Sequence, residues 1–76
     1  MTKNQILKVL KAHLDVFEDV KYKYDGDHVI VYHDDPTDIW ASVEVTAIVD
    51  LCRGLKLSFY IDEDGFNIYS NSFSAL

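Results

Sequence analysis

Cysteine, glycine and proline are all scarce in this chain of 76 residues, which contains one cysteine, three glycines and one proline. A single cysteine, Cys52, excludes an internal disulfide and any zinc site built from several cysteines, so we expect a reducing, cytoplasmic location. The glycines form no phosphate-binding loop and no dinucleotide-binding fingerprint. The sequence also lacks an apolar run of about 18 residues and the apolar core of a signal peptide, which argues against a membrane span and against secretion.

Positively charged residues are also few. Seven Lys and Arg residues stand against thirteen Asp and Glu residues, which gives a formal net charge of −6. A protein with this charge repels the phosphate backbone of nucleic acids and anionic lipid head groups. We therefore expect neither direct nucleic-acid binding nor membrane binding.

The remaining composition is that of one compact domain over residues 1–76. Hydrophobic residues make up 49% of the chain and charged residues 26%, which is typical of a globular protein. A chain this short buries only about 60% of the surface that it exposes when unfolded, so little stability is left to hold a strained active site. We expect a protein that is not an enzyme and needs no cofactor. The polar segment 71–76 is expected to fray.

The first element is predicted to be a helix that ends near Phe17. Thr2 and Gln5 have the spacing of a capping box, and Met1 is placed to contact Ile6. The apolar residues that follow repeat at helical spacing and define one core-facing side. This side includes His13, which we interpret as a histidine at the edge of the core.

A β-hairpin follows the helix. Tyr22 and Tyr24 alternate with lysines, Asp25-Gly26-Asp27 has the composition of a tight turn, and residues 28–32 form a second strand. The second strand is apolar on both faces, so it is expected at the centre of the sheet.

Residues 36–43 allow two interpretations. One is a long helix from Pro36 to Arg53. The other, which we favour because apolar and polar residues alternate there, is a third strand from about Asp38 to Val43, followed by a helix that Ser42 caps and that ends at Gly54.

A second hairpin is predicted over residues 55–69, with its turn at Asp62-Glu63-Asp64-Gly65. The predicted fold class is therefore α+β. Two helices pack on one face of a mostly antiparallel sheet of four or five strands, in the order αββ(β)αββ.

No motif points to catalysis or to a metal site. Cys52 belongs to the apolar stripe of the second helix and is interpreted as a core residue. The acidic run 33–38 offers one imidazole and three carboxylates for a divalent cation, but we interpret it as a solvated turn. The turn 62–65 resembles part of a calcium loop but lacks the closing glutamate, so we interpret it as a hairpin turn. His28 and His33 are five residues apart in one strand, which places them on opposite faces.

Two groups of residues remain as candidates for binding another protein. The outward face of the sheet is expected to carry the aromatic residues Tyr32, Trp40, Tyr60 and Tyr69. Acidic residues are concentrated in three turns, at Asp25 and Asp27, at Asp34, Asp35 and Asp38, and at Asp62, Glu63 and Asp64.

The functional hypothesis follows from these groups. Clustered acids attract a basic groove, so we expect an inhibitor or decoy that occupies the nucleic-acid-binding surface of a larger protein, as phage-encoded anti-restriction and anti-CRISPR proteins do. The alternative is a homodimeric structural or adaptor domain that pairs through the aromatic sheet face.

Overall fold

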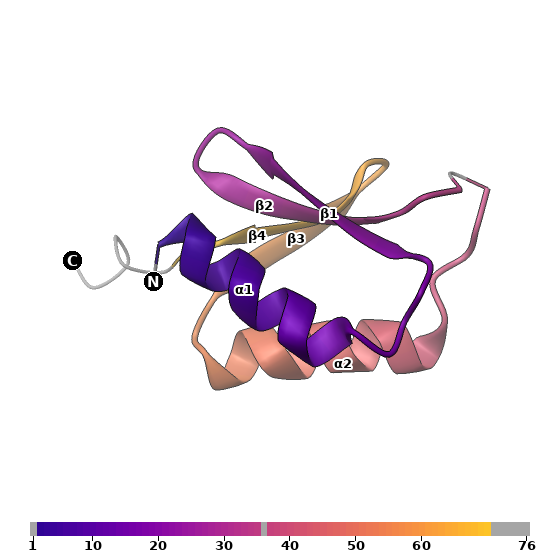
Figure 1. Ribbon diagram of the computed structural model, residues 1–76, viewed down its shortest axis with the longest axis horizontal. Helices are drawn as coiled ribbons and strands as arrows, with labels where there is room; N and C mark the ends of the chain where they lie inside the picture. Colours follow the sequence, from indigo (N-terminus) through magenta and orange to yellow (C-terminus); the bar gives the residue numbers. More distant parts are fainter. Residues whose placement is uncertain (1, 36, 71–76) are drawn as a thin grey trace.

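The computed structural model describes residues 2–35 and 37–70 and has the predicted α+β architecture (Figure 1). The elements are α1 (Lys3–Leu14), β1 (Val20–Asp25), β2 (His28–His33), α2 (Ser42–Gly54), β3 (Ser58–Asp62) and β4 (Gly65–Tyr69). The order is αββαββ, so the sheet has four strands. Neither helix in the described part of the chain is long and apolar enough to span a membrane.

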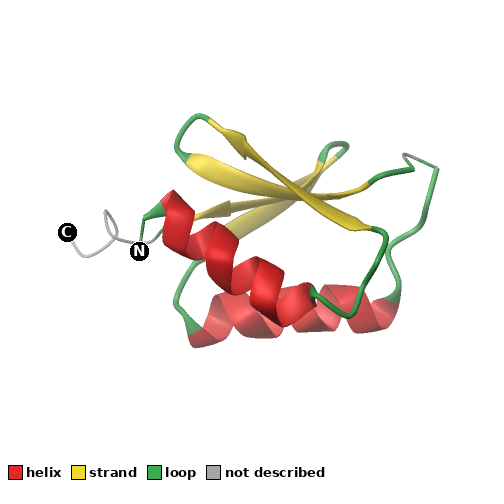
Figure 2. Cartoon of the chain, in the orientation of Figure 1, coloured by secondary structure: helices red, strands yellow, loops and turns green. Residues whose placement is uncertain are grey.

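All four strands are antiparallel, in the order β1-β2-β4-β3, and β2 is central as predicted. Both helices lie on the same side of the sheet (Figure 2). Apolar side chains from the helices and from the sheet fill the space between these two layers and form one core. That core contains Ile6, Leu10, Leu14, Val20, Val29, Val31, Ile48, Cys52, Leu57, Phe66 and Ile68.

Helix α1 begins as predicted and ends earlier than predicted. The backbone N–H of Gln5 donates to the Thr2 hydroxyl and the Gln5 side chain accepts from the Thr2 N–H, which completes the capping box. The helix stops at Leu14, and residues 15–19 connect it to β1 at Val20. The expected contact of Met1 lies outside the described residues.

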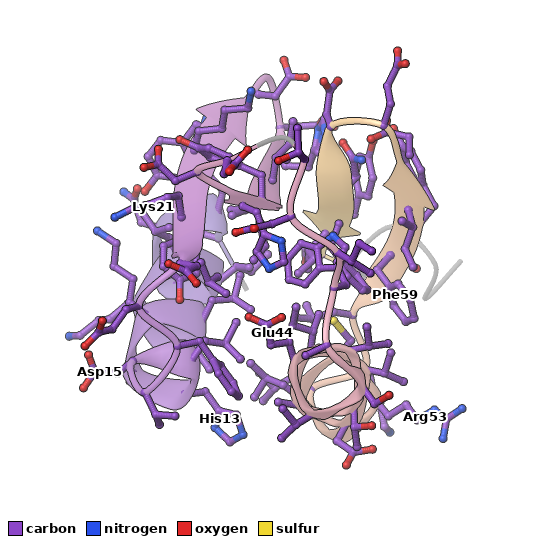
Figure 3. The ribbon with its side chains drawn as sticks, turned by 90° about the vertical axis from the view of Figure 1, so that its right-hand side faces the viewer. His13, Asp15, Lys21, Glu44, Arg53 and Phe59 are labelled. Atoms are coloured by element: carbon purple, nitrogen blue, oxygen red, sulfur yellow. The ribbon has the colours of Figure 1, made fainter. Side chains whose placement is uncertain are left out.

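His13 is not at the core edge. It is exposed, and Figure 3 shows its ring directed away from the sheet. The predicted apolar side of the helix was too broad, since its buried residues are Ile6, Leu10 and Leu14.

Of the two interpretations of residues 36–43, the shorter helix is confirmed and the third strand is wrong, as is the long helix over the described residues 37–41. Residues 38–41 form neither helix nor strand, and α2 begins at Ser42 with Ala41 as its N-cap residue. Ala41 has no side-chain acceptor, and the cap is made instead by Glu44, which accepts from the Ala41 N–H at 2.9 Å. The segment adds no strand to the sheet. Trp40 packs instead on the helix side of the sheet, where its ring meets the Phe66 ring edge-on with the centroids 4.9 Å apart.

Helix α2 ends at Gly54, as predicted. A glycine that ends a helix commonly adopts the left-handed conformation, but here Lys56, two residues later, has the positive φ of 56°. The next strand consequently starts at Ser58 rather than near Leu55. The two predicted hairpin turns are both present, with Asp25 paired to His28 and Asp62 paired to Gly65.

Candidate functional site

Two of the three predicted acidic turns meet at one end of the sheet. The segment after β2 and the β3–β4 turn border an open hollow of about 430 Å³. Figure 3 looks onto this end of the molecule. The acidic residues that line the hollow are Asp34, Asp35, Asp38, Asp62, Glu63 and Asp64. Strand order explains the meeting, because β2 and β4 are neighbours and the end of β2 lies beside the start of β4.

Local hydrogen bonds hold two of these carboxylates in place. Asp35 accepts from the backbone N–H of Thr37 at 2.9 Å and from its hydroxyl at 2.7 Å. These bonds favour the ionised form and lower the pKa of the Asp35 carboxyl. Asp62 accepts from the N–H of Asp64 at 2.9 Å in the same way. Two of the six carboxylates at this end are therefore held by hydrogen bonds within their own turns.

The third acidic turn lies at the opposite end of β2. Asp25 and Asp27 flank the β1–β2 turn, close to His28, whose ring nitrogens lie 3.9 Å from Asp25 and 3.5 Å from Asp27. The six residues of β2 separate this turn from the hollow. The acidic residues therefore form two separate groups.

A polar junction that the sequence did not reveal closes the inner side of the hollow. His33 Nε2 lies 3.2 Å and 3.3 Å from the two carboxylate oxygens of Glu44. The His33 side chain is 6% exposed and that of Glu44 is 12% exposed, and Figure 3 places Glu44 between the helices and the sheet. The His33 ring also stacks on Trp40 at 4.0 Å. The only sequence signal for this junction was Glu44 itself, which stands three residues after Ala41, the spacing at which an acidic side chain can accept from the backbone N–H of an N-cap residue.

Trp40 is not on the outward face of the sheet. It lies on the helix side, between His33 and Phe66, and packs against the core. The prediction failed because it required a third strand that does not form. Trp40 nevertheless lines the hollow, together with the acidic turns.

The three tyrosines do share the outward face. Their strand register places them on the face opposite to the core residues Val29, Val31, Phe66 and Ile68. Tyr60 is 49% exposed and stacks on Tyr69 with ring centroids 5.8 Å apart. The hydrogen bond between their hydroxyls, at 3.2 Å, is the main cause that raises the pKa of Tyr69 to about 12. Tyr32 is separate from this pair, since its ring lies beneath the ammonium of Lys23.

The remaining apolar member of that face, Ile30, is only 3% exposed. Neighbouring side chains of the same sheet face therefore cover it. The outward face therefore offers one exposed aromatic ring, Tyr60, and two partly buried ones, Tyr32 and Tyr69.

The geometry is not that of a metal site. No three His, Cys, Asp or Glu side chains within residues 2–35 and 37–70 converge closely enough to hold a metal ion. Cys52 is fully buried, and burial raises the pKa of its thiol to about 11, which suppresses the nucleophilic thiolate. What the hollow provides is a concentrated negative charge next to aromatic rings.

Comparisons of this chain with family models, with curated proteins and with solved structures gave no match.

Proposed function

We propose that this protein binds the basic, nucleic-acid-binding surface of a larger protein and so acts as an inhibitor or decoy, in the manner of anti-restriction and anti-CRISPR proteins. The observation that carries the proposal is the meeting of two acidic turns at one end of the sheet. Six carboxylates line the hollow there, from Asp34 to Asp38 and from Asp62 to Asp64, against Lys23 as the lining cation.

Such a group of charges imitates what a basic groove ordinarily binds. A channel for nucleic acid presents Lys and Arg side chains to a row of phosphates, and carboxylates offer the same sign of charge and the same acceptor oxygens. Long-range attraction between the two surfaces raises the rate at which they meet. The proposed activity needs no catalytic step.

Hydrogen bonds within the acidic turns also support the proposal. Asp35 and Asp62 are each held by a hydrogen bond from a residue two positions later. A side chain that is already held in place loses less conformational entropy on binding than a free one. These two carboxylates are therefore suited to contact a partner with little rearrangement.

A displacement assay tests this proposal. Basic nucleic-acid-binding proteins, including restriction endonucleases and RNA-guided nucleases, are loaded with a fluorescent duplex, and the protein is titrated in. We expect at least one of them to release the duplex. The double variant Asp62→Lys/Asp64→Lys should then lose about tenfold or more in potency.

The matched control is Asp25→Lys/Asp27→Lys, which changes the net charge equally at the opposite end of β2. This control should retain most of the potency. Equal losses for both variants would show that only the net charge matters, and the acidic hollow would not be the binding site.

A homodimer that pairs through the outward face is the second candidate. The observation in its favour is the exposed Tyr60 ring stacked on Tyr69. Sedimentation equilibrium of the protein and of Tyr60→Ser tests it, because a dimer that depends on this pair should dissociate in the variant. A monomer at all concentrations would exclude this candidate.

A further inference from the structure

We propose that the free edge of β3 pairs with the same edge of a second copy of this chain, so that two four-stranded sheets join into one. This inference goes beyond the decoy function and does not depend on it. It also differs from pairing through the outward tyrosines, because the contact runs along a strand edge rather than across a sheet face. Three features carry it: an unprotected edge, a self-complementary register, and charges that match in that register.

The two edges of the sheet differ in how they are protected. Within the described part of the chain, β1 and β3 each pair with one strand only. Edge strands that avoid association commonly carry lysine, and β1 does so at Lys21 and Lys23. Strand β3 contains neither lysine nor proline. Its edge is therefore the one that is open to a further strand.

Two residues of β3 direct their backbone groups to this edge. Hydrogen-bonded and non-hydrogen-bonded pairs alternate along antiparallel strands. Asp62 and Gly65 close the two-residue β3–β4 turn as a hydrogen-bonded pair, and Tyr60 is bonded to β4 in the same way. Phe59 and Ile61 are the intervening positions, so their N–H and C=O groups point away from β4. Both residues thus present donors and acceptors to a strand placed beside them.

The register follows from the largest overlap of two β3 strands. An antiparallel pair matches all five residues of each strand when Tyr60 lies on the twofold axis. Phe59 then stands opposite Ile61 of the second copy as a hydrogen-bonded pair, and the two Tyr60 residues form the closer, non-hydrogen-bonded pair. Apolar side chains meet apolar side chains in this register. Ile61, which is 56% exposed in the single chain, becomes covered.

The same register matches opposite charges at both ends of the strand pair. Lys56 is four residues before Tyr60 and Asp64 is four residues after it, so each Lys56 comes opposite Asp64 of the other copy. Both side chains are exposed. The twofold axis makes two such pairs, and no carboxylate of the β3–β4 turn stands opposite another carboxylate. The edge is therefore complementary to itself in charge, which identifies a second copy as the occupant.

The helix layer is compatible with this pairing. A twofold axis perpendicular to the sheet keeps the helices of both copies on one side of the joined sheet. Figure 3 shows Phe59 and Arg53 on the side of the molecule away from α1. Val45 and Val49 stand eight and four residues before Arg53 and lie in the same row along α2. Both valines pack partly buried against the core, so an apolar side of α2 borders the edge that the second copy occupies.

Sedimentation velocity over a range of protein concentrations tests the pairing. The contact is small, so we expect a reversible dimer with a dissociation constant in the micromolar range. Ile61→Lys places a charge on the edge and should weaken the dimer about tenfold or more. Val16→Lys is the matched control, because Val16 is 76% exposed and Figure 3 places its neighbour Asp15 on the opposite side of the molecule from Phe59. This control should leave the dimer intact.

A charge exchange tests the register. Lys56→Glu and Asp64→Lys should each weaken the dimer about fivefold or more, because each places like charges at both ends of the strand pair. The double variant Lys56→Glu/Asp64→Lys restores opposite charges and should return to within about twofold of the wild type. Lys21→Glu and Asp27→Lys make the same two charge changes away from the β3 edge, and both should have clearly smaller effects.

An engineered disulfide tests the position of the twofold axis. Tyr60→Cys should form a disulfide between two copies on mild oxidation, because the Cα atoms of a non-hydrogen-bonded pair lie about 4.5 Å apart. Tyr69→Cys, which changes the same outward face on β4, is the control and should not form one. Cys52 is buried and should add no background to either variant.

Three results would overturn the edge pairing: a monomer at millimolar concentration, equal weakening by Ile61→Lys and Val16→Lys, or a double variant that fails to recover. A disulfide through Tyr69→Cys rather than Tyr60→Cys would also overturn it and would favour pairing through the outward face. The decoy function is tested separately by displacement. The double variant Lys56→Glu/Asp64→Lys distinguishes the two proposals, since it should restore the dimer while the acidic turn stays altered.

Discussion

The imidazole of His33 and the carboxylate of Glu44 lie 3.2 Å apart and join the end of β2 to the first turn of α2. Glu44 also accepts from the backbone N–H of Ala41, so one carboxylate fixes both ends of the segment that carries Asp34, Asp35 and Asp38. Both side chains are largely buried. This junction is the structural support of the acidic hollow.

Removal of the Glu44 carboxylate should destabilise the fold. Glu44→Ala leaves the cap of α2 and the buried His33 nitrogen without their acceptor, and we expect a loss of about 2 kcal/mol in the free energy of unfolding. Urea denaturation followed by circular dichroism measures it. Glu63→Ala, the same change at an exposed turn, is the control and should have almost no effect. A loss below about 0.5 kcal/mol for Glu44→Ala would mean that the junction contributes little.

Trp40 and Tyr60 should respond differently to truncation. Trp40→Ala removes a ring that packs on His33 and Phe66, and should cost about 2 kcal/mol of stability. Tyr60→Ala removes a ring that is half exposed, and should cost less than about 1 kcal/mol. Thermal unfolding of the two variants compares them directly. The reverse order would return Trp40 to the outward face, where the sequence pattern placed it.

Gly65 should tolerate substitution much less than Gly26. A Cβ on Gly65, which has a φ of 127°, would collide with the backbone carbonyl of Val31, whereas a Cβ on Gly26, which has a φ of 62°, would meet open space. We expect Gly65→Ala to cost about 3 kcal/mol or more and Gly26→Ala about 1 kcal/mol. Chemical denaturation of both variants tests the difference, and similar costs would contradict the close approach of β4 to β2.

Stability should fall at alkaline pH in a way that depends on Cys52. Burial raises the pKa of its thiol to about 11, whereas an unfolded cysteine titrates near about 8.5. The thiol therefore contributes its full stabilisation below the unfolded pKa, and this contribution is lost as the pH rises through the folded pKa. Between these values, the wild type should lose about 3 kcal/mol more than Cys52→Ala does. Parallel pH dependences of the two proteins would disprove the assignment.

The protein should not bind DNA or RNA at physiological ionic strength. Its net charge of −6 and the carboxylates beside Tyr32 and Trp40 repel phosphates before any base can stack on those rings. Fluorescence anisotropy of a labelled single-stranded oligonucleotide measures the interaction. Saturable binding in the micromolar range would refute this expectation and weaken the decoy proposal with it.

Local sequence patterns correctly predicted the start of α1 and the turns of the two hairpins. The capping box at Thr2 and Gln5 and the two turns with acidic residues and glycine are made by residues within four positions of one another, so their chemistry is readable from the sequence. The segment before α2 was misread for the opposite reason. Alternation of apolar residues predicted a strand, but Ile39 is 89% exposed, and it is Trp40 that packs, partly buried, against the core.

The sequence by itself determined an acidic α+β domain, two hairpins, a central second strand and the residues of the acidic turns. Only the tertiary structure decided which turns act together. Asp34 and Asp62 share one hollow because β2 pairs with β4, while Asp27 is remote although it is nearer to Asp34 in the sequence. The contact of His33 with Glu44 was likewise set by strand pairing and helix packing, which depend on contacts between distant residues that no local pattern encodes.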